Sequence, residues 1–140
     1  MQMMTSTRPT DLQQCHVRLA REPAAVSEAR SQVRTAVRAW QVPVDPDIAI
    51  LLTSDLVTSA LTRGRGGTVT LAIRCSRDQL RIDLYDTSGS RETGRGIGVG
   101  VEPGLVLVAA LSADWGSFRT PAGQVTYFTL AFESDINQKR

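Results

Sequence analysis

Hydrophobic positions along this chain recur at two spacings, one typical of strands and one typical of helices. Apolar and polar side chains alternate over 15–20, whereas apolar residues fall three to four positions apart over 26–40 and over 48–63. These spacings predict one strand followed by two amphipathic helices. Asp45-Pro46-Asp47 supplies the N-cap and first-turn residues of the second helix, and the glycine-rich segment 64–67 ends it.

The second half of the chain has the pattern of two hairpins with a helix between them. We expect strands over 68–75, 79–85, 113–119 and 124–132, and an apolar helix over 104–111. This order predicts an α+β fold, a two-layer sandwich in which helices cover one face of a mixed β-sheet. The pattern predicts a single domain over 13–132, a disordered tail over 1–12 and a frayed C-terminus over 133–140.

Composition narrows the class of protein. The 140 residues are 41% hydrophobic and 21% charged, as in a globular domain that needs neither disulfides nor a metal. The net charge of +2 and the lack of a basic run mixed with aromatic residues argue against nucleic-acid binding. The chain has no apolar run near the roughly 20 residues that span a bilayer, and its N-terminus does not resemble a secretory signal. We expect a cytoplasmic protein without membrane contact.

Candidate chemistry lies on the second helix and at the end of one strand. Asp55 and Ser59 are four residues apart on one helix face, and Arg63 follows one turn later. A carboxylate there can orient a water or hydroxyl, and a neighbouring oxygen can hold Mg²⁺ against a triphosphate. Asp86 ends a strand, where a carboxylate can accept a hydrogen bond from the exocyclic amine of adenine. Each also has an ordinary interpretation, as a solvated helix face or a local turn.

The cysteines and the single histidine offer little further chemistry. Cys15 and His16 are adjacent in a predicted strand, so their side chains point to opposite faces and do not form a nucleophile–base pair. Cys15 and Cys75 show no metal-ligand spacing. We expect two reduced strand cysteines.

Four stretches together resemble the Bergerat-fold, histidine-kinase-like ATPases. They look most like the small actinobacterial ATP-binding proteins related to anti-sigma factors with serine-kinase activity. The stretches are REPAAVSEARSQVRTAVRAW, LLTSDLVTSALTR, LRIDLYDTSGS, and GLVLVAALSADWG with the hairpin FRTPAGQVTYFTL. The resemblance covers roughly residues 15–132 and implies the sandwich of that family.

This resemblance implies a site for ATP and Mg²⁺. Asp86 matches the adenine-binding Asp of the family, and Gly104 matches the glycine where the last pocket helix opens against the phosphates. Asp55 stands where the family has a Glu proposed as general base, and Ser59 stands where it has the Mg²⁺-binding Asn. Gly89 and Arg63 are the remaining expected contacts, with 88–103 as a lid.

Departures from the family pattern predict weakened or lost ATP binding. Ser59 is a poorer metal ligand than an amide carbonyl, and Asp55 retracts the carboxylate by roughly 1.5 Å. Pro103 replaces an Arg, and Val125 replaces the Thr that supports the adenine-binding Asp. Thr126 is adjacent to Val125, but we expect it to face the other side of its strand.

The resemblance and its departures together favour a regulatory protein of anti-sigma-factor type that acts by protein–protein binding. The partners that the resemblance implies are a sigma factor, an antagonist protein, or both. The alternative is an active ATP-dependent protein-serine kinase that phosphorylates the antagonist. The exposed first strand and the stripe of Arg30, Arg34 and Arg38 predict a homodimer or a partner surface.

Overall fold

The computed structural model describes residues 11–64, 66–87 and 105–133. The protein is α+β, with eight elements in these ranges: β1 (Asp11–Ala20), α1 (Ala24–Ala39), α2 (Pro46–Arg63), β2 (Thr68–Ser76), β3 (Gln79–Asp86), α3 (Val106–Leu111), β4 (Asp114–Thr120) and β5 (Gly123–Ala131). The expected tail over 1–10, the C-terminus over 134–140 and the glycine-rich segment with Gly89, Pro103 and Gly104 lie outside the described residues.

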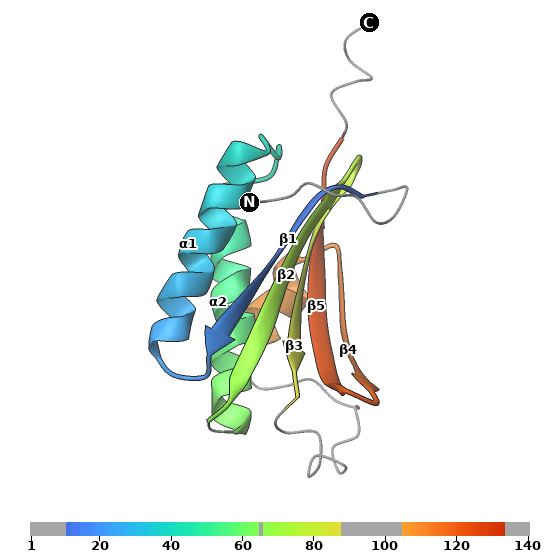
Figure 1. The fold of residues 1–140 in the computed structure, drawn as a ribbon. Coiled ribbons are helices and arrows are strands. Elements are labelled where there is room, and N and C mark those ends of the chain that lie inside the picture. Colours follow the sequence, from blue (N-terminus) through green and yellow to red (C-terminus); the bar gives the residue numbers. More distant parts are fainter. Residues whose placement is uncertain (1–10, 65, 88–104, 134–140) are drawn as a thin grey trace, which may run out of the picture.

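The five strands form one sheet in the order β1-β2-β3-β5-β4, and every neighbouring pair is antiparallel. The expectation of a mixed sheet is therefore wrong. β5 lies between β3 and β4, so β3 and β4, which run in the same direction, are not neighbours. The helices lie on one face of this sheet (Figure 1).

The two long helices follow from their apolar spacing and end signals. In α1, one side is buried against the sheet and α2: Ala25, Ala29, Val33, Ala36 and Val37. The chain leaves α1 through Gln41, whose φ of 52° lies in the left-handed region. It enters α2 through Asp45, whose side chain accepts a hydrogen bond from the Asp47 amide at 2.9 Å. This N-cap and the proline after it confirm the predicted start of α2.

Strand pairing decides which side chains face the helices. Leu84 of β3 is buried in the core under the helices, and Asp86, two residues on, shares its face. Leu84 pairs with Thr126 of β5, and directly opposed residues point the same way. Thr126 therefore faces the same side as Asp86, and the expectation that it faces away is wrong.

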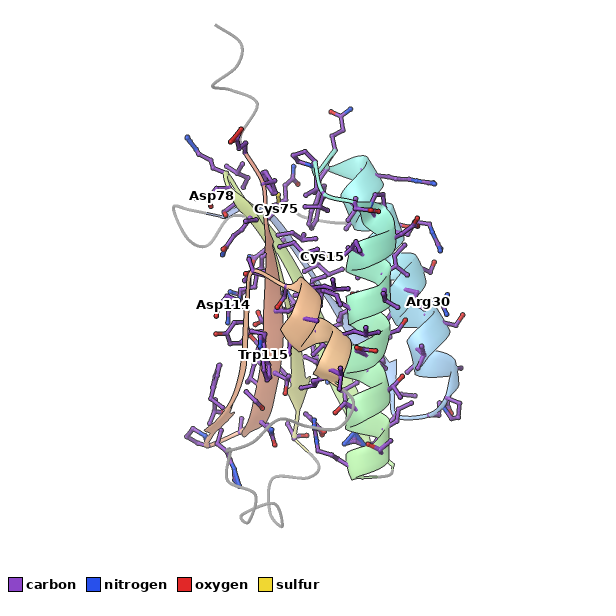
Figure 2. All side chains as sticks on the ribbon, turned by 180° about the vertical axis from the view of Figure 1, so that it is seen from behind. Cys15, Arg30, Cys75, Asp78, Asp114 and Trp115 are labelled. Atoms are coloured by element: carbon purple, nitrogen blue, oxygen red, sulfur yellow. The ribbon has the colours of Figure 1, made fainter. Side chains whose placement is uncertain are left out.

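The first strand starts earlier than its alternation predicts. β1 begins at Asp11 and pairs with the far end of β2, where Asp11 lies opposite Ser76. Cys15 and Cys75 lie on the side of the sheet that faces the helices (Figure 2) and are not joined by a disulfide. His16 is exposed, so the prediction that Cys15 and His16 point apart is confirmed. No helix in the described part of the chain is long and apolar enough to cross a membrane.

Candidate functional site

Asp86, expected to read adenine, is held by a buried arginine. Arg21 follows the last residue of β1, and its Nη2 donates to Oδ2 of Asp86 at 2.6 Å. The two side chains are 0% and 4% exposed. A charged hydrogen bond of this length, shielded from water, is among the stronger polar contacts in proteins. The carboxylate oxygen is therefore already engaged by a cation.

Arg63 connects Asp86 to a second expected site residue. Its Nη1 donates to Oγ of Ser59 at 3.3 Å, and its Nη2 lies 3.9 Å from Oδ2 of Asp86. The structure thus brings Ser59, Arg63 and Asp86 together, as expected. With Arg21, these described side chains carry two positive charges and one negative, which is a net charge of +1. A further cation would be repelled by them, so these residues do not fit Mg²⁺.

Asp55, the candidate general base, stabilises a helix end instead. Its carboxylate accepts hydrogen bonds from the backbone amides of Leu107 and Val108 in the first turn of α3. An acidic side chain at this position satisfies amides that lack helical partners. Partial burial raises the pKa of Asp55, and the two amide hydrogen bonds oppose that rise. The carboxylate thus ties α2 to α3.

A strip of polar side chains lies beside Asp86 on the helix-facing side of the sheet. Gln124 is the cross-strand partner of Asp86, and its Nε2 donates to Oγ of Ser117 at 2.7 Å. The Ser117 hydroxyl is 3.1 Å from that of Thr126, which is buried. Gln124 and Ser117 were not expected in the candidate site, although their positions in the last hairpin follow once the face of Thr126 is known.

Gly123 fixes how closely β5 approaches the end of β3. Its φ is +148°, and a Cβ on it would lie 2.5 Å from the backbone oxygen of Asp86 and 2.7 Å from Cα of Thr87. No side chain fits at that distance, so only glycine allows this approach. The position of Asp86 depends on this contact.

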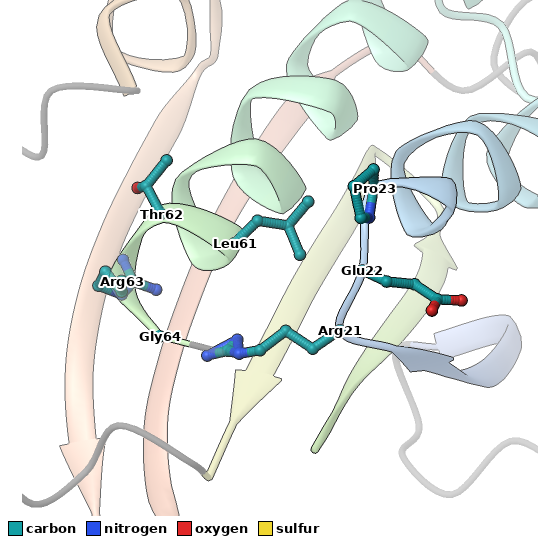
Figure 3. A pocket seen from close by; sticks show the side chains of 7 residues that line it. All are labelled: Arg21, Glu22, Pro23, Leu61, Thr62, Arg63 and Gly64. Atoms are coloured by element: carbon teal, nitrogen blue, oxygen red, sulfur yellow. The ribbon is translucent and has the colours of Figure 1, made fainter. Parts of the chain in front are cut away.

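A pocket of about 490 Å³ opens between the β1–α1 connection and the end of α2. We call it the Arg21 pocket; its lining is Arg21, Glu22, Pro23, Leu61, Thr62, Arg63 and Gly64 (Figure 3). Its lining includes Arg21 and Arg63, the two arginines beside the Asp86 carboxylate, but neither Ser59 nor Asp55. It therefore shares Arg63 with the nucleotide site that the sequence predicts, but not Asp55 or Ser59.

Arg21 was also not expected in the candidate site. It is the first residue of the stretch REPAAVSEARSQVRTAVRAW and lies just after a strand, and arginine side chains are mostly exposed, so nothing in the sequence marks it as buried. Within the described ranges, no group of three His, Cys, Asp or Glu side chains is placed to hold a metal. A comparison with models of protein families finds no match, and neither does a comparison with curated proteins.

Proposed function

We propose that this protein is a cytoplasmic regulator of anti-sigma-factor type, built on a Bergerat fold, that acts by binding other proteins and has weak or no affinity for ATP. The proposed weak or absent affinity for ATP rests on the buried contact between Arg21 and Asp86. The proposed Bergerat fold and anti-sigma-factor role rest on the sequence resemblance, and the observed α+β architecture is compatible with a two-layer sandwich.

Magnitudes favour the ion pair over adenine at Asp86. An adenine amine that takes the Oδ2 atom of Asp86 must displace Arg21 and leave a buried guanidinium without its counter-ion. Breaking such a pair costs about 3–5 kcal/mol. A hydrogen bond from the neutral amine to this charged carboxylate returns only about 1.5–3 kcal/mol. The exchange is therefore unfavourable unless the phosphates compensate, and the net positive charge at Ser59 disfavours the Mg²⁺ that normally accompanies them.

Protein binding has two candidate surfaces. Among the described strands, β1 pairs with β2 alone and lies at the edge of the sheet, and an edge strand can pair with a strand of another chain. On α1, Arg30, Arg34 and Arg38 are exposed, and Arg30 lies on the outer side of the helix (Figure 2). We propose a homodimer through β1, with the arginine stripe offered to an acidic surface of a sigma factor or antagonist. Sedimentation at micromolar concentration tests the dimer, and a monomeric mass would count against it.

The proposed weak or absent affinity for ATP is tested by thermal unfolding of the purified protein with millimolar ATP, with and without Mg²⁺, and with GTP as control. A ligand at 100 times its dissociation constant stabilises by about 2.7 kcal/mol, which a melting curve resolves for a domain of this size. We expect no ATP-selective shift. In Arg21→Met, which keeps an apolar stem but frees Asp86, calorimetry should detect weak ATP binding.

The alternative is an active protein-serine kinase, and one observation favours it. Thr126 faces the same side as Asp86, so it is a candidate for the Thr that supports the adenine-binding Asp in the family that the sequence resembles. An ATP-selective, Mg²⁺-dependent shift in the wild-type protein would overturn the proposal of a regulator without ATP and support the kinase. Transfer of labelled phosphate from ATP to a protein substrate would then be the deciding assay.

A further inference from the structure

The guanidinium of Arg21 is buried with most of its donors unused. Nη2 donates to Asp86, but Nε and Nη1 are buried and have no hydrogen-bond partner among the described residues. Each buried donor without an acceptor is costly, and such groups in folded proteins call for a further partner. Arg21 also lines the Arg21 pocket, so an acceptor that enters the pocket can meet this guanidinium.

The walls of the Arg21 pocket define what kind of acceptor it suits. Arg63 supplies a second cation, and α1 begins at the pocket edge with no side-chain cap and no acidic residue in its first turn. Both features attract negative charge. Glu22 is the opposing charge, and it is exposed, where water screens it. Pro23 and Leu61 add apolar surface.

We propose that the Arg21 pocket binds a small organic oxyanion, a carboxylate or a phosphate ester. Arg21 donates through Nε or Nη1 while Nη2 stays on Asp86, and Arg63 adds the second positive charge. The apolar body of the ligand packs on Pro23 and Leu61. A volume of about 490 Å³ suits a molecule larger than an inorganic ion. This ligand site shares Arg63 with the expected nucleotide site, but its apolar walls, Pro23 and Leu61, are not part of that site.

Gly64 lies against the guanidinium of Arg21 and places no side chain on it. A Cβ at this position would lie 3.4 Å from Nη2 of Arg21 and 3.7 Å from its Cζ and Nε, which is ordinary van der Waals contact. The backbone of Gly64 is extended, with φ of −170°, so alanine fits without strain. Gly64→Ala therefore covers the guanidinium with a methyl group and leaves the fold and both arginines in place.

The test is a titration of the full, isotope-labelled chain followed by the Nε–H resonance of Arg21 and the amide resonances of Glu22 and Gly64. The probes are phenyl phosphate and benzoate, with sodium chloride at matched ionic strength as control. We expect saturable shifts with at least one probe and none with chloride. The probe that saturates at lower concentration identifies the class, phosphate or carboxylate. Shifts that do not saturate with either probe, or that chloride reproduces, would overturn the proposal.

Variants distinguish a specific ligand site from a general attraction of anions to a basic surface. Gly64→Ala and Arg63→Gln should each weaken binding about tenfold or more. Gly64→Ala blocks access to the Arg21 guanidinium, and Arg63→Gln removes a positive charge from the pocket. Arg38→Gln removes the same charge from the exposed end of α1 and should leave the affinity unchanged. Equal weakening by Arg38→Gln and Arg63→Gln would mean that the anion is held by net charge alone, which contradicts the proposal.

Discussion

The guanidinium of Arg21 and the carboxylate of Asp86 are 65 residues apart in the chain and 2.6 Å apart in the fold. The contact joins the connection after β1 to the end of β3, across the width of β2. It determines both the electrostatics of the candidate site and the stability of this end of the sheet.

Removing either partner of this pair should destabilise the protein by about 3–5 kcal/mol, because the other is left as a buried, unpaired charge. Arg21→Met and Asp86→Asn, measured by urea unfolding, test this. The double variant should lose much less than the sum of the single losses. Arg38→Met, on the exposed side of α1, is the control and should change stability by less than about 0.5 kcal/mol. Additive single losses would show that the two side chains do not interact.

The pH dependence of stability should reveal Asp55. Burial raises the pKa of its carboxyl in the folded state above the ordinary value of about 3.9. The folded protein then binds this proton more readily than the unfolded chain, so the contribution of Asp55 to stability increases as pH falls into that window and is lost as pH rises through the folded-state pKa. The unfolding free energy of the wild type relative to Asp55→Asn should rise between pH 7 and pH 4. A fall in that difference would contradict the raised pKa.

Removing the Asp55 side chain altogether should loosen α3. Asp55→Ala leaves the amides of Leu107 and Val108 without their acceptor and should cost about 1 kcal/mol at neutral pH, the usual effect of losing a helix cap. Hydrogen exchange of those two amides is the direct measurement. Unchanged exchange rates would show that the carboxylate does not hold them.

Exchanging the side chains at 125 and 126 should distinguish the two faces of β5. Thr126→Val removes a buried hydroxyl that contacts Ser117 and should cost about 1 kcal/mol. Val125→Thr places a hydroxyl at a buried position on the opposite face, so it should also destabilise and should not improve ATP binding. A gain of ATP binding in Val125→Thr would mean that position 125, rather than 126, serves Asp86.

Alanine at Gly123 should cost more than alanine at Gly64. At Gly123 a methyl group would meet the Asp86 backbone at 2.5 Å, and φ is +148°, so a loss of about 1–3 kcal/mol or more is expected. At Gly64 the backbone is extended and the contacts are ordinary, so Gly64→Ala should be nearly neutral. Thermal unfolding of both variants makes the comparison, and equal losses would contradict the role given to Gly123.

Local pattern was sufficient to predict the elements, because each is fixed by spacing within a few residues. The apolar positions of α1, the Asp45 cap of α2 and the two hairpins were all predicted within a few residues of their observed bounds. The antiparallel order of the sheet was not, since it depends on β5 inserting between β3 and β4. That insertion joins strands distant in the chain, and no local spacing reports it.

The candidate site was predicted less completely than the fold. An alternating pattern shows that neighbouring side chains point to opposite faces of a strand, but not which face points into the core. The expected face of Thr126 was wrong for that reason. Phe128 and Leu130 lie two and four residues after Thr126, so all three side chains share one face of β5. Both are apolar, which was the available signal that this face points into the core. The partner of Asp86 left no such signal, because Arg21 is buried only by the meeting of β1, β3 and α2.

The separation of Arg21 and Asp86 also has a kinetic consequence. Their contact needs β1, β2 and β3 to be aligned first, and closing so long a loop is entropically unfavourable. We therefore expect the contact to form after the folding transition state, so that it acts on the rate of unfolding rather than on the rate of folding. Arg21, by holding Asp86, would then set how long the folded molecule persists.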